Sequence, residues 1–183
     1  GLVIFDEFHE RSLQADLGLA FARESQRVFR PDLRLLIMSA TLDCAAVTRL
    51  LQDAETISCE GRLFPVSTQY LHQPIEGRLE PAVVQSIRQA LIRDAGSLLV
   101  FLPGMAEIRR VERLLRDASL GSDILIAPLH GELPQQEQEQ AILPASPGQR
   151  KIVLATSIAE TSLTIEGVRV VIDAGLMRVP RFD

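Results

Sequence analysis

Aromatic residues and lysine are scarce in this chain of 183 residues, which has no tryptophan, one tyrosine and seven phenylalanines. Proteins that bind single strands by base stacking use several aromatic side chains, so no stacking platform is predicted. Lys151 is the only lysine, and the formal net charge is −5. The strongly basic composition typical of many nucleic-acid-binding domains is therefore missing, although local clusters of arginine are compatible with such binding.

Cysteines and long apolar runs are also rare. Cys44 and Cys59 stand in no CxxC or Cys/His spacing, so no zinc site is predicted. Such low cysteine usage favours a reducing compartment, and we expect a cytoplasmic location. No apolar run approaches the ~20 residues of a transmembrane helix, and no signal peptide is visible. With 46% hydrophobic and 23% charged residues, the composition indicates a globular protein with no membrane partner.

Apolar runs alternate with longer amphipathic stretches, which predicts an α/β fold with parallel sheets. Strands are expected at 2–5, 33–38, 97–102, 123–127, 151–155 and 168–173, with a short further strand at 56–58 and an extended segment at 66–71. Helices are expected at 12–28, 43–51, 82–93, 105–117 and 134–142. Segment 72–81 contains two prolines and a glycine and is the best linker candidate, so we expect two domains, 1–74 and 75–183.

Two adjacent carboxylates follow the first predicted strand, in Asp6-Glu7-Phe8-His9. Buried carboxylates are costly without compensation, and open α/β sheets bind ligands at the carboxyl ends of their strands. One acid holding Mg²⁺ while the next orients a water would suit phosphoryl transfer to water. An ordinary acidic helix start is the simpler alternative, because Asp and Glu also favour helix N-termini.

The second predicted strand also ends in polar residues, Ser39-Ala40-Thr41. Hydroxyl groups at such a turn can donate and accept hydrogen bonds close to a ligand. Helix capping by Thr41 or Asp43 would by itself explain these residues. Two neighbouring strands that both end in polar residues favour a shared site instead.

The order of these motifs resembles the DEAH branch of the superfamily-two ATP-dependent helicases. Segment 6–11 is similar to motif II, 39–41 to motif III, 101–108 to motif IV and 155–165 to motif V, while 61–66 and 129–138 match stretches outside the numbered motifs. Phe8 and the Leu-Pro-Gly form of motif IV are most like bacterial members. The resemblance implies two RecA-like parallel-sheet domains, the first without its N-terminal half and the second without its C-terminal end.

For the first domain, the resemblance implies a half-site for ATP and Mg²⁺. Asp6 and Glu7 would bind the metal, and Glu7 would polarise the attacking water. His9 would lie between the nucleotide and the coupling elements and reach the backbone near Ser39 or Thr41. Ser39 and Thr41 would link hydrolysis to domain movement. A lone histidine is more often structural, so only its place in the motif supports this role.

For the second domain, the resemblance implies contact with single-stranded RNA or another nucleic acid. Thr156 and Ser157 would contact the strand's backbone, where hydroxyls position without reading sequence. Gly104 in motif IV, and Arg11 after motif II, are further candidates for nucleic-acid binding. An ordinary polar crossover loop is the simpler explanation of the hydroxyl-rich run.

The later part of motif V would face the nucleotide through Thr164 and Glu166, with Glu166 near the ribose. Glu166 replaces the commoner Asp of the family, and Ser157 replaces the commoner Asn. Leu143 stands where many relatives place a Phe against the adenine. The leucine at this position predicts a looser or different clamp on the base and weak nucleotide preference.

Two motifs of the family do not occur in the chain: the GxxxxGK[ST] phosphate loop and the arginine-rich motif VI. Because that loop cradles the phosphates, we expect the 183 residues alone to bind ATP poorly and hydrolyse it negligibly. In the intact protein, the expected function is to couple ATP hydrolysis to translocation or unwinding. The alternatives are a truncated, non-catalytic binding module and an ATP-driven RNA–protein remodeller that does not unwind.

Overall fold

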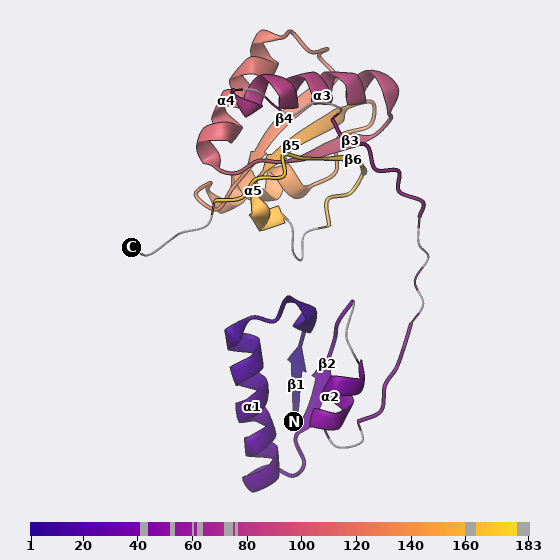
Figure 1. Ribbon diagram of the computed structural model, residues 1–183, viewed down its shortest axis with the longest axis vertical. Helices are drawn as coiled ribbons and strands as arrows, with labels where there is room; N and C mark the ends of the chain where they lie inside the picture. The colour runs from indigo at the N-terminus through magenta and orange to yellow at the C-terminus, as the bar shows by residue number, and fades with distance from the viewer. Residues whose placement is uncertain are drawn as a thin grey trace. The chain divides into compact units, whose positions relative to one another are not determined.

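The computed structural model describes residues 1–40, 44–51, 54–59, 61, 64–71, 75, 77–159 and 164–178. The chain divides into two compact units, Gly1–Thr68 and Gln69–Asp183 (Figure 1). Both contain parallel sheets, so the predicted α/β fold class is confirmed. The predicted boundary after residue 74 stays a prediction, because residues 72–74 lie outside the described part of the chain.

The first unit is a two-stranded parallel sheet with helices. Its elements are β1 (Leu2–Phe5), the 3-10 helix η1 (Phe8–Glu10), α1 (Leu13–Val28), β2 (Arg34–Ile37) and α2 (Cys44–Leu50). Helix α1 begins at an N-cap, where Ser12 Oγ accepts the Ala15 N–H at 3.1 Å. Side chains alternate between the two faces of β1, and Leu2 and Ile4 lie on the more exposed face.

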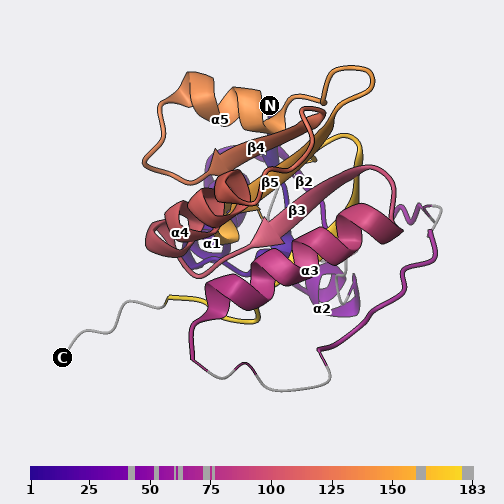
Figure 2. The same cartoon turned by 90° about the horizontal axis from the view of Figure 1, so that it is seen from above.

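The second unit is a four-stranded parallel sheet in the order β4-β5-β3-β6. Its strands are β3 (Ser97–Phe101), β4 (Ile124–Leu129), β5 (Arg150–Ala155) and β6 (Val168–Asp173), and its helices are α3 (Leu79–Arg93), α4 (Met105–Asp117), α5 (Gln135–Ile142) and the 3-10 helix η2 (Ser157–Ala159). Residues from α3 and α4 form one apolar core with the sheet, and residues from α5 form the other. Figure 2 shows α5 across the strands from α3.

Apart from shifts of one residue at the ends of several elements, three features differ from the sequence-based expectations. Helix α3 begins at Leu79 rather than at residue 82, because Pro81 falls in the first turn, where its missing N–H is tolerated. Strand β4 continues through Pro128 to Leu129, which is possible because β4 lies at the edge of its sheet. The prediction of a strand at 56–58 was wrong, because these residues form no strand. Ile57 is 93% exposed and pairs with no neighbouring strand among the described residues.

Arg150 and Lys151, at the start of β5, each donate hydrogen bonds to carbonyl oxygens near the C-terminal end of a helix. The Arg150 guanidinium donates to carbonyl oxygens at and beyond the end of α3, at 2.7 to 2.8 Å. Lys151 is buried, and its Nζ donates to the carbonyl oxygens of Gln140 and Leu143, at 2.8 and 2.5 Å, near the end of α5. Burial lowers the pKa of Lys151. The only lysine of the chain is therefore structural.

Among the helices in the described ranges, none is both long and apolar enough to span a bilayer.

Candidate nucleotide and nucleic-acid sites

Asp6 and Glu7 form a tight turn directly after β1. The Glu7 N–H donates to Asp6 Oδ1 at 2.8 Å, and Glu7 has a left-handed backbone with φ of 50°. Two further bonds join this turn to the end of β2: the Phe8 N–H donates to Met38 O at 3.0 Å, and the Met38 N–H donates to Phe5 O at 2.8 Å. The turn after β1 and the segment after β2 therefore lie together, as parallel strands require.

His9 connects the two predicted motifs of the first unit. Its Nδ1 lies 3.4 Å from the Ala40 backbone nitrogen and 3.3 Å from Glu7 Oε2. A neutral Nδ1 accepts from the Ala40 N–H, whereas a protonated Nδ1 donates to the Glu7 carboxylate, so one nitrogen can make only one of these bonds at a time. The backbone contact expected near Ser39 or Thr41 falls between them. Ser39 is half-buried, and Thr41 lies outside the described residues.

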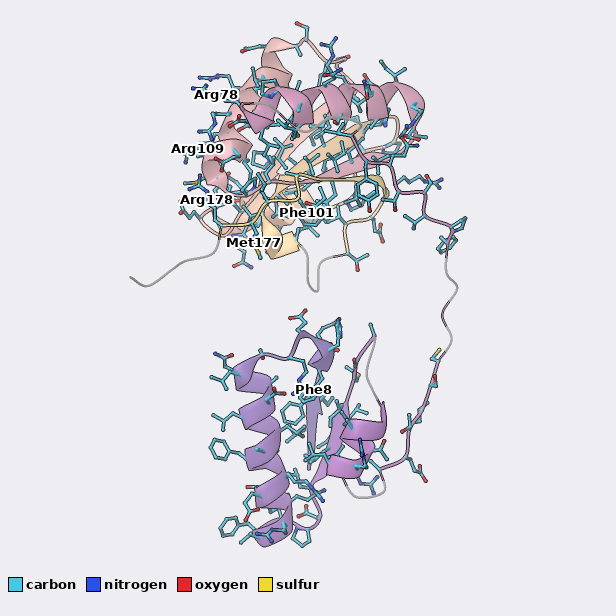
Figure 3. The ribbon with its side chains drawn as sticks, viewed as in Figure 1. Phe8, Arg78, Phe101, Arg109, Met177 and Arg178 are labelled. Atoms are coloured by element: carbon cyan, nitrogen blue, oxygen red, sulfur yellow. The ribbon has the colours of Figure 1, made fainter. Side chains whose placement is uncertain are left out.

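Arg11 is held at the start of α1. Its Nε and Nη2 donate to the two carboxylate oxygens of Asp16, at 3.2 and 3.0 Å, and its guanidinium lies 5.7 Å from the centre of the Phe8 ring. The hydrogen bonds that Arg11 donates to Asp16 raise the pKa of Arg11 above its already high value. Phe8 is buried and packs edge-to-face on Phe5, with ring centroids 6.3 Å apart (Figure 3). These contacts fix Arg11 locally, and its role toward nucleic acid stays a prediction.

The carboxylate pair suits Mg²⁺ that is shared with a phosphate ligand. In the part of the chain that the structure describes, no group of three or more His, Cys, Asp or Glu side chains could hold a metal ion. Mg²⁺ commonly keeps several waters and takes only one or two protein carboxylates together with substrate phosphates. Asp6 and Glu7 offer that number of ligands at the end of β1, where a phosphate would also be expected.

In the second unit, Thr156, Ser157 and Gly104 lie at the same edge of the sheet. Phe101 pairs with Ala155 in the parallel register, so the residues that follow β3 and β5 emerge side by side. The Thr156 N–H donates to Leu129 O at 3.4 Å, and Ser157 begins the short helix η2 with its side chain exposed. The three predicted nucleic-acid contacts of this unit are thus brought to one edge.

Glu166 lies at the opposite edge of the same sheet. The residue after it, Gly167, accepts a hydrogen bond at its carbonyl from the N–H of Ser97, the first residue of β3, at 2.8 Å. Thr164 and Glu166 are both exposed. Thr156 near the start of motif V therefore lies at the carboxyl edge, and Glu166, directly after motif V, lies at the amino edge, so the residues predicted to face the strand and Glu166 are separated.

Sequence reasoning missed a network of ion pairs beside Gly104 that is built on two buried glutamates. Glu107 accepts from Arg178 Nη2 at 3.0 Å and from Arg110 Nη2 at 2.6 Å, and Arg110 Nε donates to the buried Glu80. The backbone N–H of Glu80 and the Arg110 guanidinium hold the pKa of the Glu80 carboxyl below its ordinary value. The signal available in the sequence was a Glu in the first turn of each of two helices, but the partners lie up to 71 residues away.

Gly104 makes room for this network. A Cβ built at Gly104 would lie 3.0 Å from Arg178 Nε and 3.2 Å from Glu107 Oε2. Its φ of −176° is ordinary extended backbone, so glycine is needed here for space rather than for conformation. The predicted contact of Gly104 with nucleic acid therefore competes with an observed reason for the glycine, the seating of Arg178.

His130 is a second feature that the sequence did not single out. It follows β4 at the same edge as Thr156, and it is buried at 8% exposure. Within the described residues, its Nδ1 makes no hydrogen bond.

The fold and these motifs define a RecA-like helicase domain, and a family comparison agrees. The family model described as helicase conserved C-terminal domain matches residues 82–181, and the chain belongs to this family. Over all 183 residues, the chain is 54% identical to the ATP-dependent RNA helicase HrpB of Escherichia coli K12 and spans 22% of that protein's length. The resemblance to DEAH-box helicases is thereby confirmed.

Two crystal structures give the same result. The Escherichia coli DEAH/RHA helicase HrpB matches with a TM-score of 0.88, and the E. coli DExH-box NTPase HrpB matches with 0.82, each at 54% identity. Both matches cover 100% of this chain but only 23% and 22% of the solved chains. The chain thus corresponds to less than a quarter of the length of these relatives.

Proposed function

We propose that this chain forms part of an ATP-dependent RNA helicase, in which ATP hydrolysis drives movement along single-stranded RNA. The observation that carries the proposal is the position of His9 Nδ1, 3.3 Å from Glu7 Oε2 and 3.4 Å from the Ala40 nitrogen. This contact connects the proposed catalytic acid of motif II to motif III at the carboxyl ends of two parallel strands. The 54% identity to an ATP-dependent RNA helicase supports the same conclusion.

On the nucleotide side, Asp6 and Glu7 would hold Mg²⁺, which when bound would neutralise phosphate charge. Asp6 Oδ1 accepts the Glu7 N–H, which orients the Asp6 carboxylate that would help to hold Mg²⁺. Glu7 would orient the attacking water. His9 would link the Glu7 carboxylate to the backbone at Ala40, so that a change at Glu7 alters the contact with Ala40. Ser39 and Thr41 would carry that change into domain movement.

On the nucleic-acid side, Thr156, Ser157 and Gly104 would follow the phosphate–sugar backbone of the RNA, with Arg11 as a further contact from the first unit. Thr164 and Glu166 would face ATP, as the resemblance implies for the later part of motif V. Contacts to phosphate and sugar position a strand without reading its bases, so binding would be salt-sensitive and weakly sequence-selective. A cytoplasmic location fits the low cysteine usage of the chain.

The phosphate cradle and the arginine finger would come from outside this sequence, because the chain has neither a phosphate loop nor motif VI. The proposal therefore concerns the intact protein.

The substitution Glu7→Gln in the intact protein tests the proposal. RNA-stimulated ATP hydrolysis should fall by about a hundredfold or more, because the group that orients the water loses its charge. Binding of ATP and RNA should persist. Glu55→Gln is the matched control, since Glu55 is an exposed acid of the same unit that lies outside the motifs. Unchanged hydrolysis in Glu7→Gln would refute the assignment.

Strand separation on a duplex with a single-stranded tail distinguishes the helicase from the two alternatives. A helicase unwinds the duplex with ATP, and a remodeller hydrolyses ATP without unwinding it. A non-catalytic module binds RNA but shows no RNA-stimulated hydrolysis even in the wild-type protein.

A further inference from the structure

Arg178 is anchored at one end of its guanidinium and open at the other. Its Nη2 donates to both carboxylate oxygens of Glu107, at 3.0 and 3.3 Å. The Glu107 side chain is 11% exposed, whereas the Arg178 side chain is 68% exposed. Within the described residues, Nε and Nη1 of Arg178 make no hydrogen bond. A buried acid thus fixes an arginine whose remaining donors face outward.

Arg178 belongs to a patch of excess positive charge. The network of Glu80, Glu107, Arg110 and Arg178 contains two acids and two arginines, so it is neutral as a whole. Arg78 and Arg109 are exposed beside it and, in the described part of the chain, form no ion pair. Figure 3 shows Arg78, Arg109 and Arg178 on the same side of the second unit. We call these three residues the arginine patch.

The patch adjoins the edge that carries Thr156. Arg178 follows β6 and lies over Gly104, which follows β3, and β3 is the neighbour of β5 in the sheet. Asp173, whose Oδ1 accepts the Gly175 N–H at 2.8 Å, offsets one of the two positive charges of Arg78 and Arg109, so the balance of the patch stays positive. In a chain with a net charge of −5, positive charge concentrated here indicates an anionic partner.

We infer that Arg178 and Arg109 bind phosphates of the RNA strand, and that Glu107 is the positioning residue that sets the Arg178 guanidinium. The inference rests on the proposed function and extends its nucleic-acid site beyond motifs IV and V. Guanidinium donors fit phosphate oxygens closely, and an arginine already held by a carboxylate loses less conformational freedom on binding. Gly104 then serves the site indirectly, by admitting the Arg178 side chain.

The test measures how a fluorescein-labelled uridine oligonucleotide binds to the intact protein across a range of salt concentrations. Removing one phosphate contact with Arg178→Gln should weaken binding to all sequences alike and reduce the slope of log K against log salt by about 0.7. Over an approximately fourfold rise in salt, the variant should therefore lose about 2.6-fold less affinity than the wild type.

The matched control is Arg116→Gln, at the other end of α4. The Arg116 side chain is 67% exposed and donates to one glutamate, Glu112, at 2.6 Å, so it has the same exposure and pairing as Arg178. The control should keep the wild-type slope. An Arg178→Gln slope equal to that of the control, with both proteins folded by circular dichroism, would overturn the inference.

Three further variants separate charge from structure. Arg178→Lys should keep the slope because the charge remains, and Arg109→Gln should reduce it without touching the network. Glu107→Gln should weaken binding but keep the slope, because it releases Arg178 without removing its charge. If Arg178→Gln fails to fold, an unchanged slope in Arg109→Gln overturns the inference. A wild-type protein that does not bind the oligonucleotide would refute the proposed function as well.

Discussion

The two units differ in how completely their sheets are covered. In the first unit, only Phe8 and Leu19 among the described apolar residues are buried, and Leu2 and Ile4 are 57% and 52% exposed on one face of the sheet. In the second unit, both faces of β3 and β5 are packed, and Leu154 and Ile152 are fully buried. The proposed catalytic acids thus lie on the thinly packed unit, and the predicted nucleic-acid edge lies on the well-packed one.

Within these 183 residues, which span 22% of the relative's length, most of the apolar burial lies in the second unit and the proposed chemistry of the acids lies in the first. Burial of apolar surface is the main favourable term in folding, and the second unit has most of it. Changes in the first unit should therefore alter function more than stability, and changes in the second should do the reverse unless they fall on its carboxyl edge.

The largest expected effect comes from matched core substitutions. Leu154→Ala should lower the free energy of unfolding by about 3 kcal/mol, because it opens a cavity in a packed core. Leu36→Ala, at a strand residue of the first unit that is 43% exposed, should cost about 1 kcal/mol or less. Urea unfolding followed by circular dichroism measures both. Equal losses would show that the two units are not as different as their burial indicates.

The next comparison concerns helix ends. Lys151→Met should cost about 2 kcal/mol, since it leaves carbonyl oxygens near the end of α5 without their buried donor. Ser12→Ala, which removes the N-cap of α1 in the first unit, should cost about 1 kcal/mol. Thermal unfolding of the two variants beside the wild type checks the order. A smaller loss for Lys151→Met would contradict the structural role of the lysine.

The smallest effect concerns acid stability. Glu80→Gln should cost about 1 kcal/mol at neutral pH through its hydrogen bonds. The pKa of Glu80 is lowered in the folded state from an ordinary 4.5, so its contribution is present above that pH and is lost as the pH falls through the folded value. The gap between wild type and variant should thus shrink below pH 4.5. Asp16→Asn, in the exposed pair with Arg11, should matter less.

Local pattern was enough to predict the alternation of strands and helices. It also placed the acids and the Ser39 segment together, because neighbouring parallel strands end at one edge of a sheet. Pattern failed at residues 56–58, where an apolar stretch without a partner strand forms no sheet. It also failed for Arg178, whose partner Glu107 lies 71 residues away, since no local spacing reports such a pair. The functional roles of the site residues stay predictions.

The two basic residues at the start of β5 anchor that strand to helices on both faces of the sheet. Arg150 is tied to the helix layer on one side of the sheet and Lys151 to the layer on the other. Thr156 follows the far end of the same strand. If Thr156 contacts RNA as proposed, a force on that contact would be transmitted along β5 to both helix layers at once, through the hydrogen bonds of Arg150 and Lys151.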